Sequence, residues 1–180
     1  MLAFAAARVS AQEIPIDTSR STIVIHVGKA GLLSAAGHEH WINAPISSGS
    51  IDESALRVNF RVEAAKMTVR PDPKVDAKAQ GQIQKDMEGQ TLEAAKYPEI
   101  SFQSAKITKI SEAEWKVDGS LSLHGVTKPI TISVKRSGDG YAAHTILKQT
   151  DYGIKPASAG GGTIRVKNEI DLDFQIFARK

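Results

Sequence analysis

Apolar and polar residues alternate with a period of two along most of this chain. The clearest runs are residues 56–62, where Leu56, Val58, Phe60 and Val62 share one side, and residues 164–176, where Ile, Val, Leu and Phe alternate with charged residues. Successive side chains of a β-strand point to opposite faces, so this pattern predicts half-buried antiparallel strands. Shorter runs of the same kind occur at 23–27, 100–102, 115–123, 130–134.

Turn-forming residues separate these runs. Ser48-Gly49 is expected to close one strand, and Ser137 to Gly140 is expected to form a hairpin loop. Together, the alternating runs and the turns between them predict roughly eight to ten strands. Many short strands with this patterning are typical of a sandwich or an up-and-down barrel. An eight-stranded barrel either fills with side chains or holds one small ligand, and the pattern leaves both open.

One region lacks the alternation. Between residues 76 and 96, Ile83, Met87 and Leu92 recur at spacings that fit a helix, with prolines on both flanks of the region. We expect one or two short helices here, interrupted near Gly89. The chain is therefore predicted to be all-β with a short helical insertion.

Composition narrows the function classes. The 180 residues suit one domain, expected to span residues 12–180. The net charge of +3 is spread along the chain, which argues against nucleic-acid binding. The absence of cysteine excludes thiol catalysis, disulfides and cysteine-ligated zinc. No segment approaches the roughly 18 apolar residues of a membrane span, so a soluble mature protein with no transmembrane segment is expected.

The first residues suggest export. Leu2 to Ala7 is a short apolar run, and Val9-Ser10-Ala11 places small residues before Gln12, as signal peptidase requires. We interpret residues 1–11 as the remainder of a secretory signal. The expected location of the mature protein is the periplasm.

Two histidines form the sharpest local motif. In Gly37-His38-Glu39-His40-Trp41, the two imidazoles would share one face of a strand, which is plausible geometry for two metal ligands. Further ligands would have to come from elsewhere in the chain, the remaining histidines being His26, His124 and His144. Without clear partners the coordination is incomplete, so no tightly bound metal is expected. The simpler interpretation is hydrogen bonding at a barrel rim.

Catalytic motifs are not evident. There is no Gly-x-Ser-x-Gly nucleophile elbow, and Asp171 and Asp173 lie on the outward side of their predicted strand. The glycine run at 159–162 is not followed by a helix, as a phosphate-binding loop would be. We therefore predict no catalytic residues, no cofactor and no enzymatic activity.

Three segments together resemble the YceI-like family of periplasmic lipid-binding proteins. They are Leu92 to Phe102 (LEAAKYPEISF), Val117 to Ile132 (VDGSLSLHGVTKPITI) and Thr150 to Ile154 (TDYGI). The resemblance implies a lipocalin-like antiparallel β-barrel whose interior binds a polyisoprenoid, an isoprenoid quinone or a fatty-acid derivative. It also implies that a homodimer is to be expected.

Three hypotheses follow. The first is a periplasmic carrier of a long-chain apolar amphiphile, the second a metal-binding protein or metal-dependent enzyme using His38 and His40, and the third a sandwich-type interaction module without a cavity. For the first, the inward apolar candidates for ligand binding are Ile25, Val58, Phe60, Phe102, Val117, Ile132, Leu172 and Phe174. Lys29, His38 and His40 are the candidates for the rim of the pocket.

Overall fold

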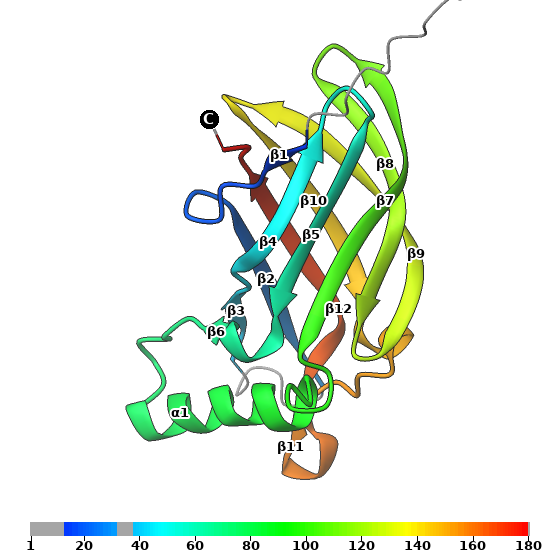
Figure 1. Cartoon of the computed structure of the whole chain (residues 1–180). Coiled ribbons are helices and arrows are strands. Elements are labelled where there is room, and N and C mark those ends of the chain that lie inside the picture. The colour runs from blue at the N-terminus through cyan, green and yellow to red at the C-terminus, as the bar shows by residue number, and fades with distance from the viewer. Residues whose placement is uncertain (1–12, 32–37, 180) are drawn as a thin grey trace, which may run out of the picture.

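The computed structural model describes residues 13–31 and 38–179, and its main element is one curled antiparallel sheet (Figure 1). Neighbouring strands follow the order β1-β4-β5-β7-β8-β9-β10-β12-β2-β3-β6, and β11 pairs with β12. The strands are β1 (Ile14–Pro15), β2 (Thr22–Ala30), β3 (His40–Asn43), β4 (Ile46–Asp52), β5 (Arg57–Glu63), β6 (Thr68–Val69), β7 (Glu99–Ser111), β8 (Glu114–Leu123), β9 (Val126–Ser137), β10 (Gly140–Lys148), β11 (Ser158–Ala159) and β12 (Ile164–Ile176).

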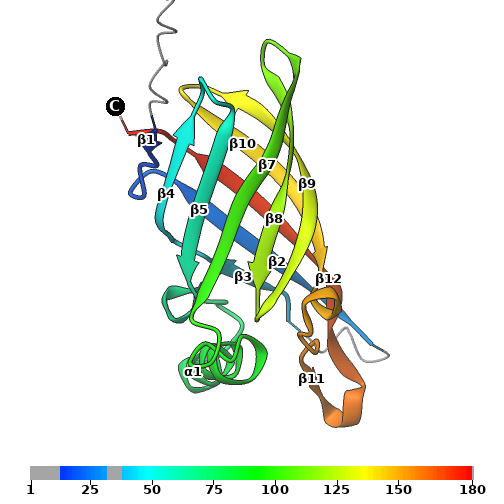
Figure 2. The ribbon, with the colours of Figure 1, turned by 45° about the vertical axis from the view of Figure 1, so that its right-hand side comes forward.

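The predicted lipocalin-like barrel is confirmed, with somewhat more strands than the predicted eight to ten. Eight strands have seven residues or more, and the alternating runs of the sequence fall on six of them, β2, β5, β7, β8, β9 and β12. The additional strands β1, β3, β6 and β11 have two to four residues, too few for a period of two to stand out. The sheet wraps around a single apolar interior, so the sandwich alternative does not apply (Figure 2).

Two sequence predictions for the β4–β5 hairpin are wrong. Leu56 was expected inside, but it lies in the turn before β5 with a φ of 50° and is 42% exposed. Ser48-Gly49 was expected to close a strand, but both residues lie inside β4. A Cβ at Gly49 would come within 2.5 Å of the Asn59 carbonyl oxygen, so this glycine permits a close approach of two strands rather than a turn.

One end of the barrel is covered by the helical segment. Helix α1 (Ala77–Asp86) begins at Asp76, whose side chain accepts a hydrogen bond from the backbone N–H of Ala79, and it continues as a π-helical turn, η3 (Met87–Thr91). This confirms the predicted helical insertion. Gln84 fastens the helix to β6, since its side-chain amide accepts from Val69 N and donates to the Met67 carbonyl. None of the described helices is long and apolar enough to cross a membrane.

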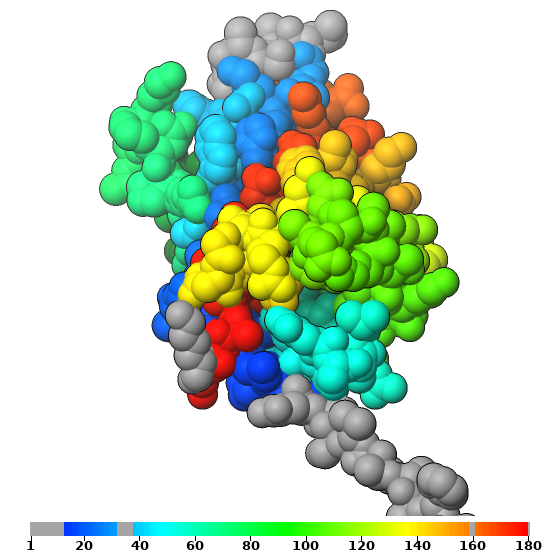
Figure 3. Space-filling model, turned by 90° about the horizontal axis from the view of Figure 1, so that it is seen from above, coloured from blue at the N-terminus to red at the C-terminus, as the bar shows by residue number. Residues whose placement is uncertain are grey.

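The opposite end carries the β4–β5, β7–β8 and β9–β10 hairpins, which come together in Figure 3. Here the first and last strands meet. Asp17 N donates to the Phe177 carbonyl and Arg179 N donates to the Pro15 carbonyl, both at 2.8 Å, while Ile16 N donates to the Gly49 carbonyl. The segment at residues 14–17 thus bridges β4 and the end of β12.

Candidate functional site

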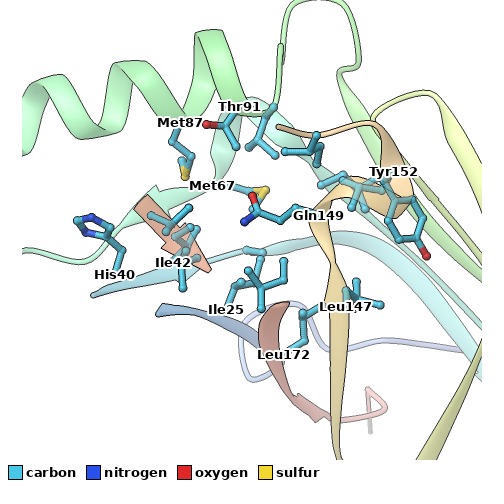
Figure 4. A pocket seen from close by; sticks show the side chains of 18 of the residues that line it. Ile25, His40, Ile42, Met67, Met87, Thr91, Leu147, Gln149, Tyr152 and Leu172 are labelled. Atoms are coloured by element: carbon cyan, nitrogen blue, oxygen red, sulfur yellow. The ribbon is translucent and has the colours of Figure 1, made fainter. Parts of the chain in front are cut away.

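The barrel interior contains a large apolar cavity at the helix-covered end. This first cavity has a volume of about 470 Å³, which falls within the roughly 300–1,000 Å³ of typical ligand pockets. Its walls come from the inward faces of β2, β3, β5, β7, β8, β9, β10 and β12, and its cover comes from α1, η3 and the residues before α1 (Figure 4). Residues that represent its walls and cover are Ile25, Ile42, Met67, Met87, Leu147 and Leu172.

A second cavity lies toward the hairpin end of the same barrel. Its volume is about 310 Å³. Four residues line both cavities: Phe60, Phe102, Ile132 and Phe174. The Phe60 ring stacks on Phe102 with 5.4 Å between centroids and lies 6.2 Å from Phe174. These four residues therefore lie where the two cavities adjoin, and they are called here the aromatic wall.

The residues predicted to bind the ligand are divided between these cavities. Those on the first cavity alone are Ile25, Leu172, His38 and His40. Val58 and Val117 line the second cavity only, and the remaining four belong to the aromatic wall. Lys29, which pairs with Val166 in the β2–β12 ladder, is among the lining residues of neither cavity.

Polar side chains gather at the rim of the first cavity. His38 Nδ1 lies 3.3 Å from Asp72 Oδ2. Burial, and secondarily the neighbouring His38, lowers the pKa of His40, which favours the neutral imidazole. Gln149 is buried among the lining residues and donates from Nε2 to the Lys167 carbonyl at 2.8 Å. An apolar interior with a few polar groups at one end suits an amphiphile.

The other histidines do not complete a metal site with His38 and His40. His26 and His144 lie on the outer face, where both contact Asp171 at 3.5 and 3.7 Å. Across residues 13–31 and 38–179, no group of three or more potential ligands is arranged to hold a metal ion.

His124 connects three segments at the helix-covered end. Its Nε2 lies 2.8 Å from Glu93 Oε2, its Nδ1 lies 3.2 Å from the Tyr152 carbonyl, and its ring contacts Tyr97 with 4.3 Å between centroids. Glu93 and Tyr97 follow η3, while Tyr152 ends the 3₁₀ turn η4 (Gln149–Tyr152). We call His124, Glu93, Tyr97 and Tyr152 the histidine latch.

The turn beneath the latch needs unusual backbone angles. His124 and Gly125 form the two-residue connection between β8 and β9, with φ of 53° and 75°, as a type I′ hairpin requires. A Cβ at Gly125 would come within 2.6 Å of Tyr97 Cε1. The latch thus fixes the β8–β9 turn against the segment that follows η3.

The three segments that carry the resemblance to the YceI-like family meet at the histidine latch. The segments Leu92 to Phe102, Val117 to Ile132 and Thr150 to Ile154 are far apart in sequence, yet each contributes a residue to this cluster. The sequence analysis named His124 only among the histidines that could supply a further metal ligand, and it did not connect His124 with Glu93. Two positive-φ residues, His124 and Glu93, carry no mark in the sequence that would have revealed the contact.

The fold and its interior define the class: an antiparallel β-barrel with apolar cavities along its axis. Residues 15–178 match the model of the YceI-like domain, and the chain therefore belongs to the YceI-like family. A UPF0312 protein of Pseudomonas putida is 35% identical over 95 residues, which cover 47% of this chain and 46% of that relative. The chain spans about half the length of the curated relatives it matches.

Solved structures share the fold at low sequence identity. A polyisoprenoid-binding domain from Saccharophagus degradans superposes with a TM-score of 0.60 at 16% identity, covering 93% of this chain and 100% of that one. BcnA of Burkholderia cenocepacia gives a TM-score of 0.58 at 15% identity, covering 89% and 98%. At these identities the likeness establishes the shared architecture.

Proposed function

We propose that this protein is a periplasmic carrier that holds the tail of a long-chain apolar amphiphile in the first cavity. The single observation behind the proposal is that cavity itself, about 470 Å³ of space lined mainly by Ile, Leu, Val, Met and Phe. Each buried CH₂ contributes about 0.8 kcal/mol, so a tail of a dozen carbons is bound without any chemical step. The role is therefore binding rather than catalysis.

The ligand class we favour is a polyisoprenoid, an isoprenoid quinone or a fatty-acid derivative. Membership of the YceI-like family and the shared fold with a polyisoprenoid-binding domain support this choice. The head group would stay at the rim, because burying a polar head in the apolar interior is unfavourable without partners. His38, His40 and Arg165 line the cavity and are available to such a head.

Two neighbouring residues of β10 provide a matched test. Thr145 lines the first cavity, whereas Ile146 points outward and is 57% exposed. Thr145→Trp should weaken binding of farnesol, a 15-carbon isoprenoid alcohol, followed by native mass spectrometry, by about tenfold or more, which is about 1.4 kcal/mol. Ile146→Trp should leave binding unchanged. Equal affinity of wild type and a folded Thr145→Trp protein would refute the carrier proposal.

We also propose export of the protein, on the motif Val9-Ser10-Ala11 before Gln12. These residues lie outside the described ranges. The mature N-terminus of protein recovered from its host should begin at or near Gln12. Intact residues 2–11 on protein recovered from the cytosol would contradict export.

A further inference from the structure

The second cavity has its own mouth at the hairpin end. Exposed residues of three hairpins line it there: Glu53 and Arg57 from β4–β5, Lys109 from β7–β8 and Arg136 from β9–β10. Its deeper part is apolar, with Val58, Val117, Ile107 and Val134 among its lining. The aromatic wall lies at its inner end, where it adjoins the first cavity.

Aromatic side chains shape the mouth. The rings of Trp115 and Tyr141 meet edge to face at 5.5 Å, and the Arg136 guanidinium lies over both at 5.5 and 5.3 Å. The Tyr141 hydroxyl donates to Glu53 Oε1. Two ring faces beside an apolar chamber of about 310 Å³ suit a compact aromatic body rather than a long chain.

One buried carboxylate at this cavity lacks a full set of partners. Asp52 lines the cavity and is 2% exposed. Its Oδ1 accepts hydrogen bonds from Ser54 Oγ at 2.6 Å and from Ala55 N at 2.8 Å. Its Oδ2 is buried and has no hydrogen-bond partner among the described residues. A buried charged oxygen without a donor is unfavourable, so this atom is available to a donor supplied by a ligand.

The charge at the cavity favours a cationic donor. The Ser54 hydroxyl, with a backbone N–H, lowers the pKa of Asp52, so the carboxyl is ionised at neutral pH. Arg57 lies opposite Asp52 in the β4–β5 ladder but is exposed to solvent, as are Lys109 and Arg136. Solvent and salt screen these exposed cations more than a buried pair, and Lys109 already contacts Glu112 at 2.7 Å.

We propose that the second cavity is a separate binding site for a compact aromatic amine. The protonated amine would donate a charge-assisted hydrogen bond to Asp52 Oδ2, and its ring would enter the apolar chamber beside the Trp115–Tyr141 pair. This site is distinct from the one proposed for the long-chain tail, since the two cavities share only the aromatic wall among their lining residues and each opens at its own end of the barrel.

Three probes that differ only in their polar end group test whether the second cavity prefers a protonated amine. They are 2-phenylethylamine, 2-phenylethanol and 3-phenylpropionate, each titrated into the isotope-labelled protein while backbone amide shifts are recorded. The amine should bind tightest, with shifts concentrated around Asp52, Trp115 and Tyr141. Tighter binding of the carboxylate, or shifts confined to the first cavity, would overturn the proposal.

Asp52→Asn tests the carboxylate with little change of shape. Asparagine keeps an Oδ1 that can accept from Ser54 and Ala55, and it replaces only the unpartnered oxygen. The amine should lose about tenfold in affinity, equivalent to about 1.4 kcal/mol, and the alcohol should be unaffected. An equal loss for both probes would mean that Asp52 acts through the fold and would refute its assignment.

A second pair of variants separates this site from the carrier site. On β10, Ala143 lines only the second cavity and Thr145 only the first. Ala143→Trp should abolish amine binding and leave farnesol binding intact, and Thr145→Trp should do the reverse. If Ala143→Trp, folded by circular dichroism, also blocked farnesol, the two cavities would be one tunnel for one ligand, and the separate site would be refuted while the carrier proposal stood.

Discussion

Replacing Gly125 by alanine tests the histidine latch. At a φ of 75°, an L-residue is strained, and the left-handed conformation costs about 1–2 kcal/mol. The new Cβ would also lie 2.6 Å from Cε1 and 3.1 Å from Cδ1 of Tyr97. Because that ring is held against His124, it has to move, and overpacking of this kind costs about 1–3 kcal/mol. The free energy of unfolding should therefore fall by about 2–5 kcal/mol.

Gly153 supplies the matched control from the same neighbourhood. Its φ and ψ of 71° and 7° are left-handed as well, but a Cβ there would meet only His124 Nδ1, at an ordinary 3.8 Å. Gly153→Ala should lose the backbone contribution alone, about 1–2 kcal/mol. The two variants and wild type are compared by urea unfolding, with equal slopes required before midpoints are converted to free energies.

A double variant isolates the contact itself. In a Tyr97→Leu background the ring that meets the new Cβ is gone, so Gly125→Ala should then cost no more than Gly153→Ala does. Equal losses for Gly125→Ala and Gly153→Ala in the otherwise wild-type protein would show that Tyr97 yields freely, and the reasoning about the latch would be wrong.

Two further predictions concern pH. Burial, and then the hydrogen bond to Glu53, raises the pKa of Tyr141 to about 12. The stability that this group contributes is therefore complete below pH 10 and is lost as pH rises toward 12. Glu53→Gln should lower the titration midpoint of Tyr141, measured by ultraviolet absorbance with Tyr141→Phe as the reference. The lowered pKa of His40 has the opposite consequence, because a neutral buried imidazole stabilises the fold above its ordinary pKa of 6.5 and this stability is lost as pH falls below that value. Unfolding midpoints across this range should therefore shift less in His40→Gln than in wild type, and an equal shift would rule out His40 as the source.

The alternating pattern predicted six of the eight long strands because burial on one face imposes a period of two. It could assign Ile25, Val58 and Val117 to the inside of the barrel, and they do face it. It could not assign their height along the barrel axis, which depends on strand register and tilt. For this reason one list of inward residues proved to be divided between two cavities.

Other features depend on contacts that no local pattern encodes. Gly49 permits the approach of Asn59 and Ile16, and a strand-interior glycine of this kind is easily mistaken for a turn. Asp52 resembles any polar residue at a turn, and its burial arises from the strands packed around it. The latch likewise joins Glu93, His124 and Tyr152, which only the finished fold brings together.

The pairing of β2 with β12 has a consequence for the order of folding. Strands β7, β8 and β9 each pair with the next strand in the chain and are able to form ladders as soon as each hairpin is complete. Ile23, in contrast, pairs with Phe174, and Ile16 bridges to Ala178. Such long loops close slowly, because the entropy loss precedes the contacts that compensate for it. Strand β2 can therefore pair fully only after β12, the last strand, has been made. The interior of the barrel becomes enclosed only when the N-terminal and C-terminal strands have paired.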